Sequence, residues 1–415
     1  MKHLFAILTA VLAVLCCQAQ QAIMGTWTGK LSVGAASLTL AINLSSDDQG
    51  GVQCTFDSLD QGAKGIKTSV SHCSDDSVSI AIPAIGASYV AHRDGDVLKG
   101  TFMQMGQSFP LDLKRGAQVL NRPQTPVAPF PYKTEEVTFT NIADLATLSG
   151  TLTYPVGYEK MNPADVPVVL MVTGSGPQNR DEEIMDHKPF LVIADYLARN
   201  GIASLRYDDR CTGKSTGGDV KSATTLNFAH DAEAGYEKLK LLKKFGKIGI
   251  LGHSEGANIA FILGAWEKAD FVVSLAGVGV KGDTALTAQA NCIMRLNGMP
   301  GTADTKQYRN MVLMQNNPWL TWFVNYDPAS DIAATRCPVF AAGGDKDCQV
   351  VSPLNLDGIK NALHEGKDNR FIEYPGLNHL FQECKTGNPA EYREIEQTIS
   401  PQLLKDLTEW IKNLK

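Results

Sequence analysis

The alternation of hydrophobic and polar residues changes character about a third of the way along the chain. Between residues 22 and 116, short runs alternate with a period of two, as at Leu38, Leu40, Ile42 and Leu44, and the breaks contain DDQGG, DQGAKG and RDGD. This pattern is typical of strands joined by tight turns. Roughly eight such segments predict an all-β accessory domain over residues 22–116, built as a small up-and-down barrel or a sandwich.

A second pattern begins at residue 134 and continues to residue 415. Apolar runs such as PVVLMVTG, KIGILG and CPVFAAGG alternate with helical stretches, for example Thr225 to Lys244. Runs that are apolar on both faces are typical of a parallel sheet with helices on both sides. We therefore expect a mostly parallel α/β sheet over residues 134–415, with its functional loops at the carboxyl ends of the strands. Residues 117–133 contain four prolines and predict a stiff linker.

The first residues, MKHLFAILTAVLAVLCCQAQ, combine one lysine, an apolar run and then small and polar residues. This order predicts a secretory signal peptide over residues 1–19. The apolar run from Leu4 to Leu15 is too short to anchor the protein across a bilayer. We expect an exported protein, periplasmic or extracellular, without a membrane span. Lipoprotein anchoring through Cys16 or Cys17 is the less favoured alternative.

Charge and cysteine content narrow the expectations further. The formal net charge of −6 gives no reason to expect nucleic acid or an anionic membrane surface as a partner. Of nine cysteines, two lie in the expected signal peptide, which leaves seven. Cys54 with Cys73, and Cys348 with Cys384, are candidate disulfide pairs in an oxidising compartment. Buried free thiols are the favoured alternative for each pair.

The pattern GxSxG occurs twice, around Ser215 and around Ser254. A nucleophile elbow needs a strand that runs directly into the serine and a helix that starts directly after it. GHSEG has the strand KIGIL before it and the helix ANIAFILGAWEKA after it, whereas the loop-like GGDVKSATT follows GKSTG. Ser254 is therefore the predicted nucleophile. The stretch DDRCTGKST also approaches a phosphate-binding P-loop, but Asp208 replaces the first glycine, which argues against nucleotide binding.

A serine nucleophile needs a base and an acid, and in this kind of fold they follow it in the order acid, then histidine. His379 lies in YPGLNHLF after the last predicted strand and is the expected base, whereas His364 lies in a polar helical stretch. The acid is expected after CPVFAAGG, where Asp345 and Asp347 both occur. The spacing of GxxD with an apolar residue after it favours Asp347, and Asp345 is the alternative.

Two backbone amides are needed to stabilise an oxyanion. The first is expected from Glu255, the residue after Ser254, at the start of a helix. The second is expected from the glycine-rich loop GSGPQNRDEE, where we favour Gly176 over Ser175.

The motifs GSGPQNRDE, LRYDDRxxGKSTG, GHSEG, GxxDxxV and NHLF follow one another in this order. Together they resemble the α/β-hydrolase superfamily, and more narrowly the secreted bacterial carboxylesterases that carry an extra β domain before the catalytic domain. The resemblance covers about residues 134–415. It implies that Ser254, Asp347 and His379 are the catalytic residues and that no cofactor is needed.

The resemblance also gives the stretch around Arg210 a role. It implies a buried polar brace formed by Asp208 or Asp209 with Arg210. Cys211 departs from the pattern, because glycine is usual at that position, so we expect the turn to be built differently.

A cap over the site is expected at about residues 281–336, which is short for enzymes of this type. Its apolar residues include Trp319, Trp322 and Phe323, which are candidates for substrate binding. A small helical core accounts for most of the cap's apolar residues equally well, and the remainder could line an acyl pocket.

These features lead us to expect a serine hydrolase that cleaves small carboxylic esters with short to medium acyl groups through an acyl-enzyme. A serine aminopeptidase, or a thioesterase or acyltransferase, on the same fold is the enzymatic alternative. An alternative of another class is a secreted ligand-binding protein whose β domain does the work. The sequence gives no oligomeric state.

Overall fold

The computed structural model describes residues 22–33, 36–47, 51–61, 63–116 and 120–414. The expected signal peptide over residues 1–19 lies outside them. The chain divides into two compact units, Met1–Leu120 and Asn121–Lys415, each of which is described by itself. Among the residues that the structure describes, none of the helices combines the length and apolar character needed to cross a bilayer.

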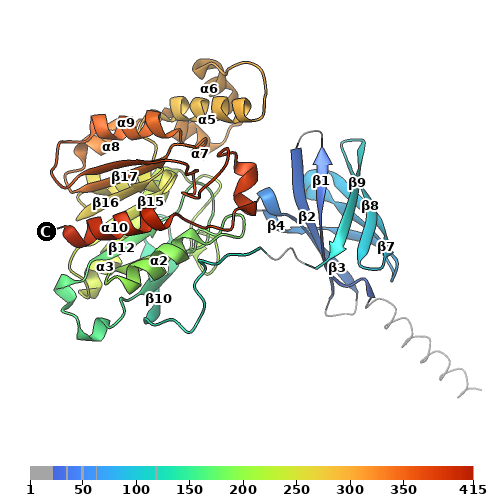
Figure 1. The fold of residues 1–415 in the computed structure, drawn as a ribbon, viewed down its shortest axis with the longest axis horizontal. Coiled ribbons are helices and arrows are strands. Elements are labelled where there is room, and N and C mark those ends of the chain that lie inside the picture. The colour runs from blue at the N-terminus through green and yellow to red at the C-terminus, as the bar shows by residue number, and fades with distance from the viewer. Residues whose placement is uncertain (1–21, 34–35, 48–50, 62, 117–119, 415) are drawn as a thin grey trace, which may run out of the picture. The chain divides into compact units, whose positions relative to one another are not determined.

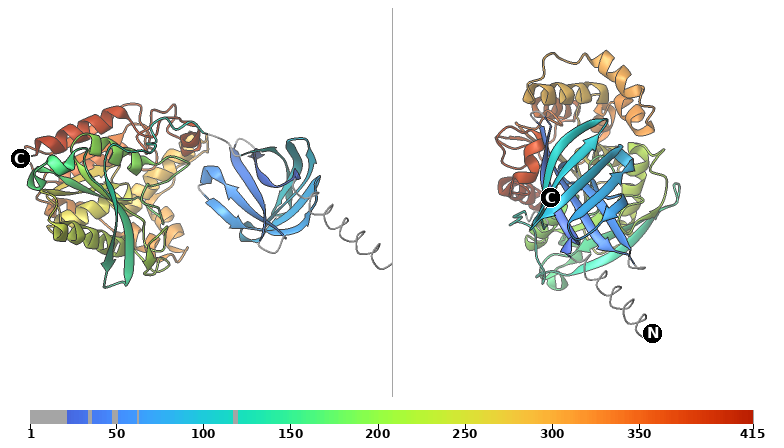
Figure 2. Two further views of the ribbon diagram at one scale, coloured as in Figure 1. Left: turned by 90° about the horizontal axis from the view of Figure 1, so that it is seen from below. Right: turned by 90° about the vertical axis from the view of Figure 1, so that its right-hand side faces the viewer.

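Unit 1 is an antiparallel, barrel-like sheet in the order β4-β3-β2-β1-β9-β8-β7-β6-β5. All consecutive strands are neighbours except β4 and β5, which stand at the two ends of the order, and β1 also pairs with β9. The topology is therefore up-and-down, and the strands curve around a shared interior (Figure 2). The expected all-β domain is confirmed. Its strands are β1 (Gly25–Val33), β2 (Ala36–Ser46), β3 (Val52–Ser58), β4 (Ala63–Lys67), β5 (Ser69–Cys73), β6 (Ser77–Ile82), β7 (Ala87–Asp94), β8 (Val97–Gln104) and β9 (Gln107–Arg115).

The interior of unit 1 is filled by its own side chains. Trp27, Phe56, Tyr89 and Phe102 are all buried in one hydrophobic cluster. Their polar atoms are satisfied inside it: the Trp27 indole N–H donates to the carbonyl of Ile23 at 2.8 Å, and the Tyr89 hydroxyl lies within 3.2 Å of two strand carbonyls. Alternate residues of a strand point to the same face, so the hydrophobic residues that recur with a period of two form the core of this unit.

Unit 2 contains a mixed sheet in the order β10-β11-β13-β12-β15-β16-β17-β18, with the short β14 beside β11. From β13 to β18 neighbouring strands are parallel, whereas β10 and β11 are antiparallel. The expected fold class is therefore confirmed. The strands are β10 (Thr134–Asn141), β11 (Ala146–Thr153), β12 (Val168–Val172), β13 (Ala203–Tyr207), β14 (Thr216–Gly217), β15 (Ile248–His253), β16 (Phe271–Leu275), β17 (Val339–Gly344) and β18 (Arg370–Tyr374).

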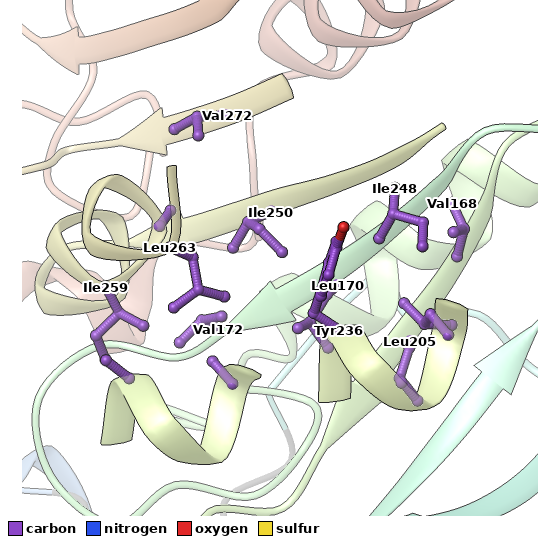
Figure 3. Close-up of a cluster of buried hydrophobic side chains, with 14 of the residues drawn as sticks. Val168, Leu170, Val172, Leu205, Tyr236, Ile248, Ile250, Ile259, Leu263 and Val272 are labelled. Atoms are coloured by element: carbon purple, nitrogen blue, oxygen red, sulfur yellow. The ribbon is translucent and has the colours of Figure 1, made fainter. Parts of the chain in front are cut away.

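Helices cover both faces of this sheet, as Figure 1 shows. Side chains at alternate positions of β12 enter different cores: Val168, Leu170 and Val172 join one, and Val169 and Met171 the other. The first core contains side chains of α3 (Thr225–Leu242), α4 (Glu255–Ala265), α8 (Ala329–Ala334) and α9 (Ser352–Ala362), and Figure 3 shows part of it. The second contains side chains of α2 (Pro189–Arg199) and α10 (Pro401–Asn413).

Three further helices form the cap. They are α5 (Gly282–Leu296), α6 (Thr305–Leu313) and α7 (Pro318–Asn325), and α5 and α6 project from the body of unit 2 in Figure 1. A small hydrophobic cluster that includes Val278, Ala285, Phe323 and Val350 joins α5 and α7 to the loops at the carboxyl ends of β16 and β17. The cap is thus seated over the sheet edge at which functional loops are expected.

The proline-rich segment does not run free between the units after residue 120. The Arg122 guanidinium donates to the carbonyls of Met185, Asp186, Arg393 and Ile395. Further along, Gln124 and Tyr132 also bond to unit 2. Residues 121–133 are therefore held on unit 2 by hydrogen bonds of their side chains, although the proline content of this segment predicts only a linker.

Candidate active site

Ser254 occupies a sharp turn between a strand and a helix. β15 ends at His253 and α4 begins at Glu255, so the serine alone makes the connection. Its φ of 55° and ψ of −119° are unfavourable for a residue with a side chain. The Ser254 N–H donates to the carbonyl of Leu275 on β16 at 2.8 Å, which helps to hold the turn. Packing of the buried strand and helix on either side maintains this strained conformation.

The two glycines of GHSEG are needed because backbone passes close to both. A Cβ atom on Gly252 would lie 1.9 Å from the carbonyl oxygen of Gly256. One on Gly256 would lie 2.1 Å from the carbonyl oxygen of Val172, at the end of β12. Any side chain at either position would push the helix away from the sheet. The two glycines of GxSxG are therefore required by the close approach of the backbone at this turn.

His379 and Asp347 meet in the buried loops after β18 and β17. His379 Nδ1 lies 2.7 Å from Asp347 Oδ2, and the other oxygen of Asp347 accepts the N–H groups of Gln349 and Val350. Asp345, the alternative acid, is exposed and accepts the N–H of Gly376 instead. Because Nδ1 faces the carboxylate, Nε2 is the ring nitrogen that can take up a proton.

Ser254 and His379 both line a pocket of about 420 Å³. Its walls come from the loop after β12, from the turn at Ser254 and from all three cap helices. Trp319 and Phe323 line it, as the sequence predicts. Trp322 does not: it stacks on Tyr326 with ring centroids 4.5 Å apart and packs against the main core. The remaining cap residues in the wall are Ala285, Leu286, Gln289, Ala290, Ile293, Tyr308 and Leu320.

The glycine-rich loop brings Gly174 and Ser175, rather than Gly176, into this pocket. A Cβ atom built on Gly174 would lie 3.3 Å from the Ser254 Cβ, so the loop passes directly beside the serine. Gly176, with a φ of 93°, turns the chain away and lines a second, much smaller cavity. Glu255, the first residue of α4, also lines the pocket.

The side chain of Glu255 links four parts of unit 2. It is buried, and its Oε1 accepts the Thr225 hydroxyl of α3 at 2.6 Å and the Trp319 indole N–H of α7 at 2.7 Å. Burial raises the pKa of this carboxyl, while the bonds from Thr225, Trp319 and Ser175 favour its charged form. The carboxyl therefore holds the cap and the loop of Ser175 against the helix that follows Ser254.

A second buried histidine lies beside His379, and sequence reasoning missed it. His253 Nδ1 is 2.9 Å from Glu182 Oε1, and its Nε2 is 2.9 Å from the carbonyl oxygen of His379. Glu182 also accepts the N–H of Gly174 at 3.0 Å. The only signals in the sequence are a histidine before the serine and an acidic run after the glycine-rich loop. Nothing in their spacing indicates that they meet.

The stretch DDRCTGKSTG is structural, but its bonds differ from the expected brace. Arg210 pairs with Asp231 and Asp144, not with Asp208 or Asp209. The partner of Asp208 is Arg180, and Asp209 accepts the hydroxyl of Thr173 and the N–H of Gln178. The expectation was wrong because these partners come from distant segments.

Within the same stretch, Ser215 and Cys211 have local roles. The Ser215 hydroxyl donates to the carbonyl of Asp208 at 2.7 Å and accepts the N–H of Ser149 at 2.9 Å, which fixes the turn to β11. Cys211 has a φ of 58°, the conformation that glycine adopts most readily. The turn therefore keeps the glycine-like backbone although the residue has a side chain, contrary to our expectation of a different turn.

The candidate disulfides are not formed. All seven cysteines in the described part of the chain are free thiols. Cys348 and Cys384, beside the acid and base loops, each direct the sulfur to a different carbonyl, those of Gly387 and Gly376. Cys54 likewise faces a backbone carbonyl rather than Cys73. The favoured alternative of free thiols therefore holds in this structure.

The amino-acid sequence is similar to a known family and to a known protein. A family model described as "Serine aminopeptidase, S33" matches residues 188–297. Esterase EstD of Thermotoga maritima is 25% identical over 281 residues, which are 64% of this chain and 65% of that protein. This chain thus matches less than two thirds of the relative's length.

Solved structures with a similar chain path include an esterase and the protein Est1E. The Pyrococcus furiosus esterase Pf2001 is 18% identical, with 72% of this chain and 98% of that chain covered and a TM-score of 0.47. Est1E from Butyrivibrio proteoclasticus, solved with ferulic acid bound, is 16% identical, with 66% and 96% covered and a TM-score of 0.44.

Proposed function

Because unit 2 belongs to the α/β-hydrolase superfamily, we propose that this protein is a serine hydrolase that cleaves carboxylic esters with short to medium acyl groups. One observation carries the proposal: a strained serine at a strand-to-helix turn shares a pocket with a buried His379–Asp347 pair whose Nδ1 and Oδ2 atoms are 2.7 Å apart. The esterases among the compared proteins support the same reaction class.

The proposed reaction proceeds in two halves. His379 Nε2 takes the proton of the Ser254 hydroxyl as the oxygen attacks the ester carbonyl, and Asp347 stabilises the imidazolium that forms. The alcohol leaves with the proton that His379 returns to it, which gives the acyl-enzyme. Water, activated by His379 in the same way, then releases the acid and regenerates the serine.

Two backbone N–H groups are proposed to bind the oxyanion. The first is that of Glu255, at the start of α4, where amides have no partner within the helix. For the second we propose Ser175 in place of Gly176, because Ser175 lines the pocket. Glu182 accepts the neighbouring N–H of Gly174, so that donor is already engaged.

The pocket favours esters over the peptide substrates that the name of the matching family model suggests. An aminopeptidase needs a carboxylate that receives the α-ammonium group of its substrate. Two carboxylates line the pocket, those of Glu182 and Glu255, and Oε1 of each already accepts hydrogen bonds from groups of the protein, while Oε2 of Glu255 is buried. In the cap, Asp283 pairs with Arg309. The apolar walls from α5 and α7 suit a neutral acyl chain.

Hydrolysis assays test the proposal. Wild type is expected to hydrolyse p-nitrophenyl acetate, butyrate or octanoate faster than aminoacyl anilides, and Ser254→Ala is expected to lower the rate by roughly 10⁴-fold or more. Preference for anilides would support the aminopeptidase. Ester hydrolysis that survives in Ser254→Ala would exclude Ser254 as the nucleophile, and Ser215→Ala serves as the control with an unrelated serine.

We also propose that the protein is exported to the periplasm or beyond the cell, on the pattern of residues 1–19. N-terminal sequencing of the protein from fractionated cells tests this. An intact Met1 in the cytoplasmic fraction would contradict it.

A further inference from the structure

We propose that His253 and Glu182 form a second, ionised histidine–carboxylate pair that positions the oxyanion loop and the base loop for catalysis. The inference rests on the proposed ester hydrolysis and adds two positioning residues to it. Neither side chain is needed as nucleophile, base or acid in that reaction.

The pair connects three segments that carry reacting groups. Glu182 lies in the loop after β12, His253 is the last residue of β15, and His379 lies in the loop after β18. Glu182 Oε1 binds both the N–H of Gly174 and His253 Nδ1, while His253 Nε2 reaches the backbone carbonyl of His379. The two imidazole centroids are 4.7 Å apart. The ring of His253, the residue before Ser254, therefore connects the loop of Ser175 to the loop of the base His379.

The contacts are those of an ionised pair. A backbone carbonyl can only accept, so His253 Nε2 must carry a proton. Its Nδ1 faces a carboxylate oxygen that already accepts the N–H of Gly174, and a proton on Nδ1 completes that bond. With protons on both nitrogens, His253 is an imidazolium beside a carboxylate. A neutral ring could make only one of these bonds as a donor.

The surroundings of His253 agree with this charge. Burial opposes protonation of the ring, but the charge of Glu182, the bonds to Glu182 and to the carbonyl of His379, and the more distant charge of Asp347 outweigh it and raise the pKa of His253. The facing groups come from the loops after β12, β17 and β18. Each histidine has its own carboxylate, so His379 can become charged beside a pair that is already neutral overall.

The sign of the pH effect follows from the raised pKa. Below it, both donor bonds of His253 are intact; as the pH rises through it, one nitrogen loses its proton and one bond is lost. The base loop or the oxyanion loop is then released. Because small displacements of reacting groups are costly to catalysis, activity should fall on the alkaline side, with kcat affected more than KM.

The test compares pH profiles of kcat and KM for p-nitrophenyl butyrate in wild type, Glu182→Gln and His253→Gln. Glu182→Gln keeps an acceptor but removes the charge, so the alkaline limb should move down by about one pH unit or more, a tenfold change in the proton affinity of His253. His253→Gln should remove that limb and lower kcat by about tenfold or more, with KM within about threefold. His364→Gln, an exposed histidine, is the control and should match wild type.

A second measurement does not depend on activity. Nitrogen-15 spectra of the histidine side chains should show His253, identified by its loss in His253→Gln or its shift in Glu182→Gln, doubly protonated at pH 7.5. A neutral His253 there would overturn the inference, as would unchanged pH profiles in both variants. If wild type cleaved no ester, the proposed function would fail, while the spectra would still decide whether the ionised pair exists.

Discussion

The indole N–H of Trp319 donates to the carboxylate of Glu255 across 2.7 Å, which joins cap helix α7 to the residue that follows Ser254. Trp319→Phe should therefore loosen the cap while keeping most of the aromatic surface. We expect it to lower the free energy of unfolding by about 1–2 kcal/mol, because a buried carboxylate loses a donor. Urea denaturation measures this. Trp322→Phe, at a tryptophan that stacks on Tyr326 outside the pocket, should preserve the Glu255 bond, and equal losses in the two variants would contradict the assignment.

The choice between the two aspartates of GGDKDCQV can be tested directly. Asp347→Asn removes the charge that stabilises the His379 imidazolium, and kcat/KM for p-nitrophenyl butyrate should fall by roughly 10³–10⁴-fold at neutral pH. Asp345→Asn, which affects only the exposed bond to the N–H of Gly376, should stay close to wild type. An inactive Asp345→Asn beside an active Asp347→Asn would reverse the assignment.

Asp209 should make the stability of unit 2 depend on pH. Burial raises the pKa of this carboxyl to about 8, although the bonds from Gln178 and Thr173 favour its charged form. A group whose pKa is higher in the folded state contributes stability at low pH and loses it as the pH rises through the folded value. From pH 6 to pH 9, wild type should lose about 3 kcal/mol relative to Asp209→Asn, which carries no such proton. Parallel denaturation curves for the two proteins would show that Asp209 is already ionised.

Cys211 offers a gain in stability. A side chain at a φ of 58° costs about 1 kcal/mol, and glycine avoids that cost. Cys211→Gly should therefore be more stable than Cys211→Ala, which keeps the strain, by up to about 0.5 kcal/mol after the greater freedom of glycine in the unfolded chain is subtracted. Both variants lose the thiol, so their comparison isolates the backbone. A less stable glycine variant would indicate that the turn is not strained.

The sequence predicted the features that depend on local pattern. The GxSxG turn at Ser254 is recognisable because a buried strand, two glycines and a helix follow one another without a gap. His379 and Asp347 were predicted from their order in the chain, because each lies in the loop after a predicted strand. The structure brings these residues together because the topology of a parallel sheet places the carboxyl ends of its strands at one edge.

What the sequence did not reveal depends on contacts between distant segments. Glu182 and His253 are 71 residues apart, and neither stands in a motif that indicates a partner. The direction of the loop after β12 determines that Ser175 lines the pocket and Gly176 does not. Trp319 lines the pocket, whereas Trp322, one turn further along α7, does not. Arg210 pairs with Asp144, between β10 and β11, and with Asp231 of α3, rather than with the aspartates beside it in the sequence. Hydrophobic periodicity carries no information on these choices.

The contacts of Arg122 show that unit 2 begins well before its first strand. The Arg122 guanidinium donates hydrogen bonds to four carbonyl oxygens from two separate segments. The segment that contains Arg393 and Ile395 lies immediately before α10. A shortened protein that started at the first strand, β10, would leave those oxygens to water and free both segments. Unit 2 therefore starts at Asn121, thirteen residues before its sheet begins.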